Sequence, residues 1–302
     1  MRKFFVGLLV LVLAVSLTVV PLTATSAGLN VNPSVAVKGF TDSATSPSKG
    51  KPPEPPGKPP KVAPNKWAVV IGISKYADPR ANIYNPDKDA KEMAWVLEKR
   101  YGFADDHIRL LTNEYATKDN ILAAIAWLID NENSTSIVVF FYCGHGGQTE
   151  DGARGDPVDE ADGLDEYIVT YDMWGITDDY LASEFENIES TNFMLWFGSC
   201  HSGGMSPDLN GDGRVIVAAT EEDKVAYDYL LLRNTLFGYY YIDEGMKDGK
   251  ADGATYDGYA GTRDGIVTVE EAFYYAKPLV TAEQPEQVPF IWDSDLTSDL
   301  YL

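Results

Sequence analysis

The sequence predicts an α/β fold in which a mostly parallel central sheet carries helices on both faces, giving a three-layer sandwich. Three observations predict this class. Short apolar runs rich in β-branched residues alternate with longer segments of helical periodicity. Several of these runs are apolar at every position, as strands are when helices cover both faces of a parallel sheet. Two of the runs end in glycine-rich turns, at the strand ends where open parallel sheets gather their reactive groups.

The expected elements follow one another from Lys66 onward. The expected strands are short runs rich in apolar residues, at residues 66–74, 107–112, 136–143, 167–172, 192–200, 214–220 and 287–292. The helical segments share an apolar face and lie at residues 85–102, 117–132, 177–188, 234–246 and 268–280. Asn85 and Thr117 are N-cap candidates for the first two helices, and Pro86 fits a first helical position.

The first 65 residues differ from the rest. Arg2 and Lys3 precede an apolar run at residues 4–20, followed by small residues. This order is typical of a secretory signal peptide, here residues 1–27, and it predicts a secreted or cell-surface protein. An uncleaved membrane anchor is the alternative, because 17 apolar residues are near the lower limit for a span. Residues 28–65, rich in Pro and Lys, predict a linker or pro-segment, and residues 66–302 a single domain.

The net charge of −22 is unevenly distributed. Residues 1–65 carry seven of the 24 Lys and Arg but only two of the 46 Asp and Glu, so residues 66–302 have a net charge of −27. Such a domain repels nucleic acid and anionic lipid, so neither is an expected partner. Calcium and basic peptide substrates suit it, although a solvated acidic surface is the alternative explanation. The basic N-terminal segment could also lie across the domain as its own inhibitor.

Two of the predicted strands end in turns that carry reactive side chains. The turn "CGHGG" contains His145, and the turn "GSCHSGG" contains Cys200, 55 residues later. Neighbouring parallel strands would bring both to the same sheet edge, where an imidazole could deprotonate a thiol nucleophile. The adjacent glycines allow a peptide carbonyl to approach. The backbone N–H groups of Gly146 and Cys200 could then hold a developing oxyanion.

Four stretches together resemble the caspase-like cysteine peptidases, nearest to the metacaspases: "FFYCGHGG", "DEADGLDEYIVTYD", "GSCHSGG" and "VIVAAT". The resemblance implies a caspase-like sandwich with His145 as general base and Cys200 as nucleophile. It implies hydrolysis of protein or peptide substrates through a thioester, with no organic cofactor.

Two alternatives concern the same turns. His201, next to Cys200, could compete as the base, although consecutive side chains on a strand or turn diverge. Cys143 and Cys200 could form a disulfide in an exported protein. Against a disulfide, Cys143 lies in an apolar run, where a buried free thiol packs well.

The resemblance also bears on the substrate pocket. Metacaspases usually have an acid two residues before the nucleophile, where this sequence has Gly198. Asp89 matches the family's acid near the start of the first helix. Glu222 and Asp223 follow the fifth strand, where the family places a substrate-binding loop. These acids predict cleavage after Arg or Lys, and the alternative is that they are surface charges.

Two stretches predict calcium binding. "DLNGDG" places Asp208, Asn210 and Asp212 at alternate positions before a glycine, as in the opening of an EF-hand loop, but the twelfth position is Ala219. The acidic loop with Asp159 and Asp162, together with Asp156 and Asp165, resembles the region where some metacaspases bind calcium. Asx-rich turns are the alternative for both stretches.

The leading functional prediction is a secreted or surface cysteine endopeptidase, made as a zymogen and cleaving after Arg or Lys. A legumain-like peptidase with a different P1 choice, often Asn, is one alternative, and it fits the missing acid at Gly198. An inactive calcium-binding relative is another, but such a protein would be expected to lack His145 or Cys200, and both are present.

Overall fold

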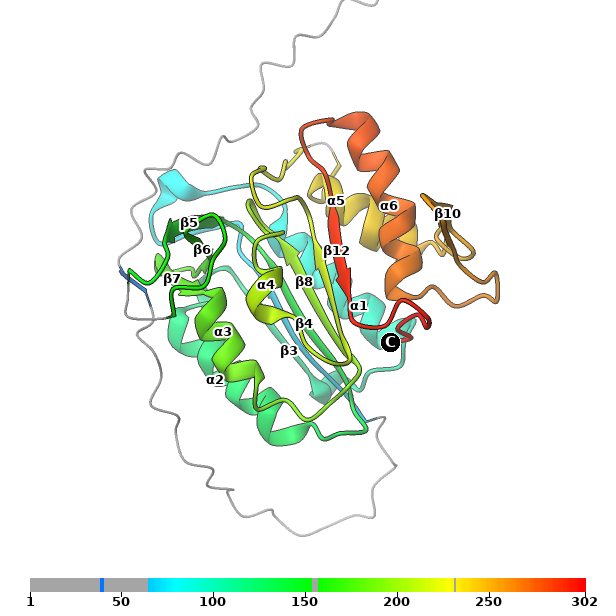
Figure 1. Cartoon of the computed structure of the whole chain (residues 1–302), viewed down its shortest axis with the longest axis horizontal. Coiled ribbons are helices and arrows are strands. Elements are labelled where there is room, and N and C mark those ends of the chain that lie inside the picture. Colours follow the sequence, from blue (N-terminus) through cyan, green and yellow to red (C-terminus); the bar gives the residue numbers. More distant parts are fainter. Residues whose placement is uncertain (1–38, 41–64, 154–156, 231) are drawn as a thin grey trace, which may run out of the picture.

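The computed structural model describes residues 39–40, 65–153, 157–230 and 232–302 (Figure 1). The predicted signal peptide and most of the predicted linker therefore lie outside the described residues. Among the described residues, none of the helices combines the length and the apolar character that crossing a bilayer requires.

A six-stranded sheet with strand order β12-β9-β8-β4-β2-β3 forms the centre of the fold. Its strands are β2 (Lys66–Gly72), β3 (Ile108–Thr112), β4 (Ile137–Cys143), β8 (Phe193–Gly198), β9 (Arg214–Ala218) and β12 (Phe290–Asp293). Five of them run parallel, and only β12 is antiparallel, against β9. The predicted class, a mostly parallel sheet with helices on both faces, is confirmed.

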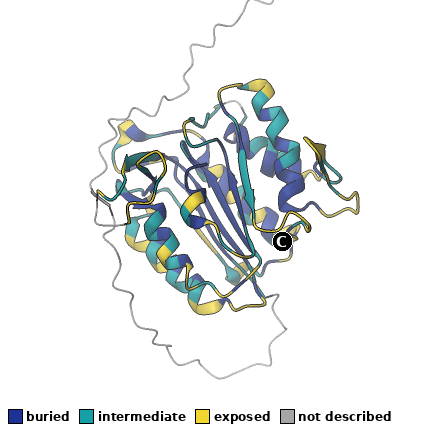
Figure 2. Ribbon diagram, viewed as in Figure 1, coloured by how far each residue is buried: buried dark blue, intermediate teal, exposed yellow. Residues whose placement is uncertain are grey.

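Helices cover both faces of this sheet, on its two sides in Figure 1. The helices are α1 (Pro86–Lys99), α2 (Lys118–Asn131), α3 (Asp178–Phe185), α4 (Ser206–Leu209), α5 (Leu236–Gly238) and α6 (Val269–Glu283), and a π-helix spans Tyr239–Lys247. One face packs against α1, α6 and the π-helix, and the other against α2 and α3. Alternate residues of each strand point to opposite faces of the sheet and so enter different cores. Phe141 and Trp196 pack in the core under α1 and α6, and Phe140 and Phe197 pack in the core under α2 and α3. The central strands are therefore buried throughout, as Figure 2 shows.

A second, small sheet has the order β1-β7-β6-β5. Its strands are β1 (Gly39–Phe40), β5 (Gly146–Glu150), β6 (Leu164–Val169) and β7 (Trp174–Thr177). β5 continues directly from the turn after β4, so the predicted acidic loop at residues 150–166 is shorter than expected. A further two-stranded hairpin joins β10 (Thr255–Tyr256) and β11 (Tyr259–Ala260). Three short 3₁₀ turns complete the fold, at Pro79–Ala81, Asp105–His107 and Asn113–Tyr115.

Each predicted helical segment contains a helix, although α1 and α3 each end three residues earlier than predicted, α6 ends three residues later, and α4 was not predicted. Thr117 caps α2 through its side chain, as predicted. Asn85 occupies the N-cap position of α1, but its amide donates to Asp228 and to two backbone carbonyls instead of capping. The helix predicted at residues 234–246 is mostly a π-helix.

The strand register positions the two reactive turns. β4 and β8 are neighbours, and Cys143 lies opposite Gly198 in their ladder. His145 and Cys200 each follow two residues later, so both leave the sheet at the same level of its carboxyl edge. The sheet therefore brings together two residues that are 55 positions apart in the sequence.

Candidate active site

A cleft opens at the carboxyl edge of the central sheet. His145 and Cys200 both line it, together with Gly198, Tyr227, Asp228 and Thr235. Its lining comes from the turns after β4 and β8, from the loop after β9 and from the start of α1. The two side chains that the sequence predicted to act together are thus in one cleft.

The His145 imidazole is almost completely buried, with 5% of its surface exposed. Its Nε2 lies 2.8 Å from the carbonyl oxygen of Ala81, and its backbone N–H donates to the Tyr76 hydroxyl. A carbonyl oxygen can only accept, so Nε2 carries the proton and Nδ1 is the nitrogen that can take one up. Burial lowers the pKa of His145 below its usual value, because the charged form is desolvated. The ring is therefore neutral at neutral pH and ready to act as a base.

The Cys200 thiol is also buried, with 5% exposure. Its Sγ accepts a hydrogen bond of 3.3 Å from the backbone N–H of Ala226. Burial raises the pKa of this thiol to about 11. The resting site therefore pairs a neutral thiol with a neutral imidazole, and deprotonation must accompany attack on the substrate.

Gly146 lies tightly against the nucleophile turn. A Cβ at this position would lie 2.8 Å from the carbonyl oxygen of Cys200 and 2.8 Å from the Cβ of Ser199. Val169 N–H donates to the His145 carbonyl, so Gly146 and Ile168 form a non-hydrogen-bonded pair in the β5–β6 ladder. The ladder consequently does not use the N–H of Gly146, as an oxyanion donor requires.

The raised thiol pKa predicts how Cys200 should react with a small alkylating reagent. With a pKa of about 11, the thiolate fraction at pH 7 is on the order of one in ten thousand. Iodoacetamide should therefore react slowly at pH 7 and faster with each rise in pH toward 11, because the thiolate is the nucleophile. The rate is measured by intact-protein mass, with Cys200→Ala as background. Fast alkylation that does not change between pH 5 and pH 8 would contradict the neutral pair.

The His201 side chain contacts the loop after β9. Its Nδ1 lies 2.8 Å from the carbonyl oxygen of Glu222, and its backbone N–H donates to the carbonyl of Lys224. Its φ is +60°, in the left-handed region that side chains other than glycine rarely adopt. The side chain therefore holds the loop after β9, and His201 is not among the residues that line the cleft with Cys200, so the structure favours His145 over His201 as the base.

The disulfide alternative is wrong, because Cys143 and Cys200 are both free. Cys143 is fully buried beneath Gly198, and its thiol points to the Asp89 carboxylate, with Sγ 3.5 Å from Oδ2. A Cβ on Gly198 would lie 2.7 Å from this sulfur and 2.5 Å from Cζ3 of Trp196. The acid that metacaspases carry at this position therefore has no room here.

The structure does not bring the other predicted substrate-binding acids to the cleft surface. Asp89 is fully buried, and both of its carboxylate oxygens accept hydrogen bonds from Thr235. Burial raises its pKa to about 8, so it is largely protonated at neutral pH. Glu222 lies against Asp162: burial, reinforced by the neighbouring Asp162 carboxyl group, raises the pKa of Glu222. Asp223 is exposed and pairs with Lys224. None of these three acids lines the cleft, which corrects the prediction that they form the substrate pocket.

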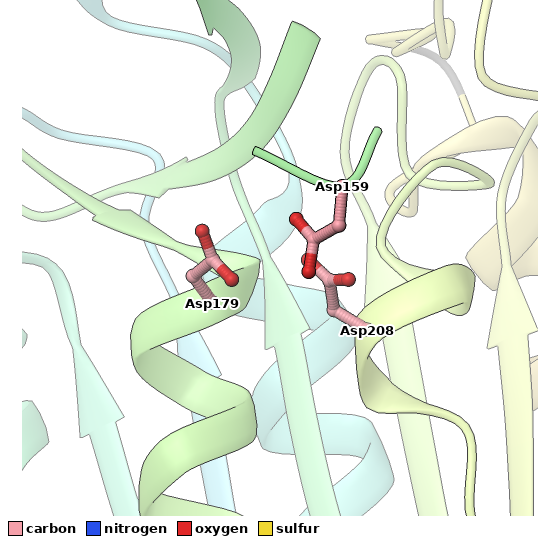
Figure 3. Close-up of side chains that lie close together, drawn as sticks. All are labelled: Asp159, Asp179 and Asp208. Carbon is pink, nitrogen blue, oxygen red and sulfur yellow. The ribbon is translucent and has the colours of Figure 1, made fainter. Parts of the chain in front are cut away.

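The acidic loop meets the start of α3 and the short helix α4 next to the cleft. Figure 3 shows Asp159, Asp179 and Asp208 converging from these three segments. Their carboxylate oxygens lie within 4.8 Å of one another, and the same holds for a set formed by Glu160, Asp178 and Asp208. We call these five residues the acidic cluster.

Carboxylates in and beside the acidic cluster hold their protons more tightly than usual. Burial, reinforced by the neighbouring acids, raises the pKa of Glu160 to about 8 and that of Asp208 to about 6. Burial likewise raises the pKa of nearby Glu166 to about 9. Glu160 Oε1, Glu166 Oε2 and Asp208 Oδ2 are buried without a hydrogen-bond partner among the described residues. Buried oxygens that lack donors are the ligands that a hard cation prefers.

The EF-hand-like interpretation of residues 208–213 is wrong. Asp208 lies within α4, so its carboxylate turns toward Asp159 and not toward the two residues that follow in the motif. Asn210 follows the helix and donates to the carbonyl of Pro207. Asp212 lines a separate cavity beside Asp293. Of the predicted calcium ligands, Asp159 and Asp208 therefore belong to the acidic cluster. Asp162 lies next to the cluster and interacts with Glu222.

Sequence reasoning missed Glu160 and Glu166 in the acidic loop and β6, and also three aspartates of this region. Asp178 and Asp179 open α3, where acids in a first turn are ordinary helix starts. Asp228 lines the cleft from the loop after β9 and accepts from Tyr84 and Asn85, more than 140 positions away. The sequence did contain a signal for Asp178 and Asp179, since these two adjacent acids directly follow a strand. No local pattern pointed to Asp228.

Comparison with known proteins gives one family. A family model described as "Caspase domain" matches residues 65–301. Metacaspase-1A of Aspergillus terreus is 35% identical over 147 residues, which cover 45% of this chain and 35% of that protein. Metacaspase-4 of Arabidopsis thaliana is 34% identical over 148 residues, covering 46% and 34%. The match thus spans about a third of the length of these curated relatives.

Solved structures show the same fold. A protein of Geobacter sulfurreducens superposes with a TM-score of 0.56 at 19% identity, covering 79% of this chain and 97% of that one. Caspase-1 of Spodoptera frugiperda superposes with a TM-score of 0.51 at 13% identity, covering 79% and 89%. At such identities the similarity concerns the arrangement of the sheet and helices.

Proposed function

The chain belongs to the caspase domain family, and from that premise we propose that it is a cysteine endopeptidase with Cys200 as nucleophile and His145 as general base. The observation that carries the proposal is the orientation of the imidazole. Nε2 is held by the carbonyl of Ala81, which leaves Nδ1 as the proton acceptor in the cleft that Cys200 lines. A neutral imidazole beside a neutral thiol is the arrangement that proton transfer during attack requires.

The reaction follows from these groups. Cys200 Sγ attacks the carbonyl carbon of the scissile bond while its proton passes to His145 Nδ1. The oxyanion that forms accepts hydrogen bonds from the N–H groups of Gly146 and Cys200. His145 then gives its proton to the leaving amine as the C–N bond breaks, which leaves a thioester. Water, deprotonated by His145, attacks the thioester, and the proton returns to the thiol as the acid leaves.

We also propose that the enzyme prefers Arg or Lys before the scissile bond and is exported as a zymogen. A net charge of −27 in residues 66–302 supports the preference. The basic composition of residues 28–65 supports an inhibitory role for that segment. β1 also pairs with β7 at Trp174 and Gly175, so Gly39 and Phe40 lie against the small sheet that includes Gly146.

The test is hydrolysis of fluorogenic peptides that carry Arg, Lys, Asn, Asp or Gln at P1, with Cys200→Ala as control. The assay compares the full chain with a chain that begins at Val62. Cys200-dependent turnover after Arg or Lys, faster in the shorter chain, is the proposed result. Turnover only after Asn would favour a legumain-like preference. Equal activity of the two chains would contradict the inhibitory segment, and turnover that survives Cys200→Ala would contradict the peptidase assignment.

We further propose that calcium binds the acidic cluster. The fit rests on the all-oxygen donor set and on the buried oxygens of Glu160, Glu166 and Asp208 that lack partners among the described residues. Glu166 also approaches the nucleophile turn, since a Cβ on Gly204 would collide with its carboxylate. A bound cation would remove the repulsion between these acids and hold this part of the turn after Cys200 in place.

Calcium is therefore expected to raise the melting temperature. At a calcium concentration about 100 times the dissociation constant, linkage adds about 2.7 kcal/mol, which corresponds to roughly 5 °C or more for a domain of this size. Magnesium should do less, because it requires tighter octahedral geometry. Asp208→Asn should reduce the calcium shift, whereas Asp212→Asn, in the separate cavity, should keep it. Melting curves that are identical in calcium and in chelator would sink this proposal.

A further inference from the structure

Asp228 differs from the other acids near Cys200 in its position. It is half-buried and lines the cleft with the nucleophile, whereas Asp89 is fully enclosed behind Thr235. Among the described residues, no Lys, Arg or His forms an ion pair with Asp228. Lys88 Nζ donates to the Asn85 side chain and favours the charged form of Asp228 from a distance, without forming an ion pair with it. The cleft therefore contains a carboxylate with no cation in direct contact among the described residues.

Neutral donors hold the Asp228 carboxylate in place. Oδ2 accepts from the backbone N–H groups of Tyr84 at 2.6 Å and of Asn85 at 3.1 Å, and Oδ1 accepts from the Asn85 amide at 2.5 Å. These bonds favour the ionised form, against the burial that raises the pKa of this group. A carboxylate has about four acceptor sites, and three are in use. One site is left for a further donor.

The chain position of Asp228 sets an upper limit on how far it lies from Cys200. Ala226, two residues earlier, donates its N–H to Cys200 Sγ. Two residues of extended chain span at most about 7 Å, which is comparable to the length of a Lys or Arg side chain. A substrate whose scissile carbonyl lies at Cys200 could therefore place the head group of its P1 residue at Asp228.

We propose that Asp228 is the carboxylate that binds the P1 side chain and selects Arg or Lys, in place of Asp89 and of the acid that Gly198 replaces. This inference rests on the proposed peptidase function. A guanidinium or ammonium group would form a charge-assisted hydrogen bond to the anchored carboxylate. An uncharged P1 side chain would leave the carboxylate in the cleft without an ion-pair partner, and an acidic one would be repelled.

The loop that carries Asp228 has a second attachment to the rest of the domain. A variant at Asp228 can therefore change the charge while the loop stays in place. The backbone N–H of Tyr227 donates to Gln287 Oε1, and Gln287 Nε2 donates to the carbonyl of Ala219. Gln287 is fully buried. Asp228→Asn should therefore fold, since it keeps the size of the side chain and one acceptor oxygen while removing the charge.

The experiment measures kcat/KM for matched peptides with Arg, Lys or Gln at P1, in the wild type, Asp228→Asn and Asp89→Asn. Asp228→Asn is expected to lower kcat/KM for the Arg peptide by about 100-fold, which is the effect of removing one partner of an enclosed charged pair. It should change the Gln peptide by only a few-fold. Asp89→Asn should keep the Arg-to-Gln ratio, because Asp89 is already protonated at neutral pH.

Each result supports or overturns the assignment. An unchanged Arg-to-Gln ratio would overturn the assignment. If that unchanged ratio came with an equal loss for all three peptides, Asp228 would only anchor the loop. If Asp228→Asn does not fold, Asp228→Glu, which keeps the charge, should retain the preference for Arg, and its loss would overturn the assignment. Failure here leaves Cys200-dependent turnover intact, whereas failure of the proposed function removes that turnover from the wild type itself.

Discussion

Cys200→Ala is expected to lower kcat for peptide hydrolysis by about 10⁴-fold or more, and His145→Ala by a similar factor. Groups that act as a unit in nucleophilic catalysis each remove several orders of magnitude when they are lost. The reason lies in the resting state of the pair. The thiol, with a pKa of about 11, is protonated at neutral pH, so attack depends on the neutral imidazole that accepts its proton. Turnover is measured on a P1-Arg peptide, with circular dichroism to verify the fold.

Two matched controls separate catalysis from structure. Cys143→Ala removes the other cysteine, which packs beneath Gly198 and does not line the cleft. His201→Ala removes the neighbouring imidazole, which bonds to the carbonyl of Glu222. Both variants should keep turnover within about tenfold, since neither side chain takes part in proton transfer. Near wild-type turnover in a pure preparation of Cys200→Ala would show that the nucleophile is another group.

Gly198→Asp, which restores the acid of the family pattern, is expected to lower the free energy of unfolding by about 3 kcal/mol or more. Its Cβ would collide with Trp196 and Cys143, and overpacking typically costs about 1–3 kcal/mol. Its carboxylate would also enter a buried site that already contains Asp89, 3.5 Å from the Cys143 sulfur. An uncompensated buried charge destabilises by about 3–5 kcal/mol.

Urea unfolding measures this effect, with the midpoint and the slope read separately. Gly198→Ala is the matched control, because it introduces the same Cβ without a charge and should lose less stability than the aspartate. The difference between the two variants isolates the carboxylate. A stable Gly198→Asp protein with a stronger preference for Arg would contradict this account, since it would show that the position still accepts a pocket acid.

The sequence predicted the central sheet well because its signals are local. The runs that became β4 and β8 are apolar at each position, and each ends in a glycine turn, so both the strands and the place of His145 and Cys200 at the sheet edge could be inferred. The signals that mark where helices begin are equally local, as the predicted N-cap at Thr117 shows. These features depend on neighbouring residues and on one general rule of parallel sheets.

The surroundings of the dyad were not predictable in the same way, because they depend on contacts between distant segments. Asp208 fits an EF-hand opening in the sequence, but the start of α4 at Ser206 turns its carboxylate toward Asp159. Asp89 matched a family acid, yet Thr235, 146 positions away, encloses it. Asp228 carried no local signal, since its donors come from residues 84–85. The contacts that a loop side chain makes depend on tertiary packing, which sequence periodicity does not encode.

The central claim, that His145 activates Cys200 for attack on a substrate carbonyl, is tested most directly by covalent labelling with a peptide electrophile that carries Arg at P1. The chain has only two cysteines, so peptide mapping after labelling identifies the modified one without ambiguity. The account predicts modification of Cys200 alone at pH 7, at a rate far above that of iodoacetamide, and loss of this rapid labelling in His145→Ala. Modification of Cys143, or rapid labelling of Cys200 that persists in His145→Ala, would contradict it.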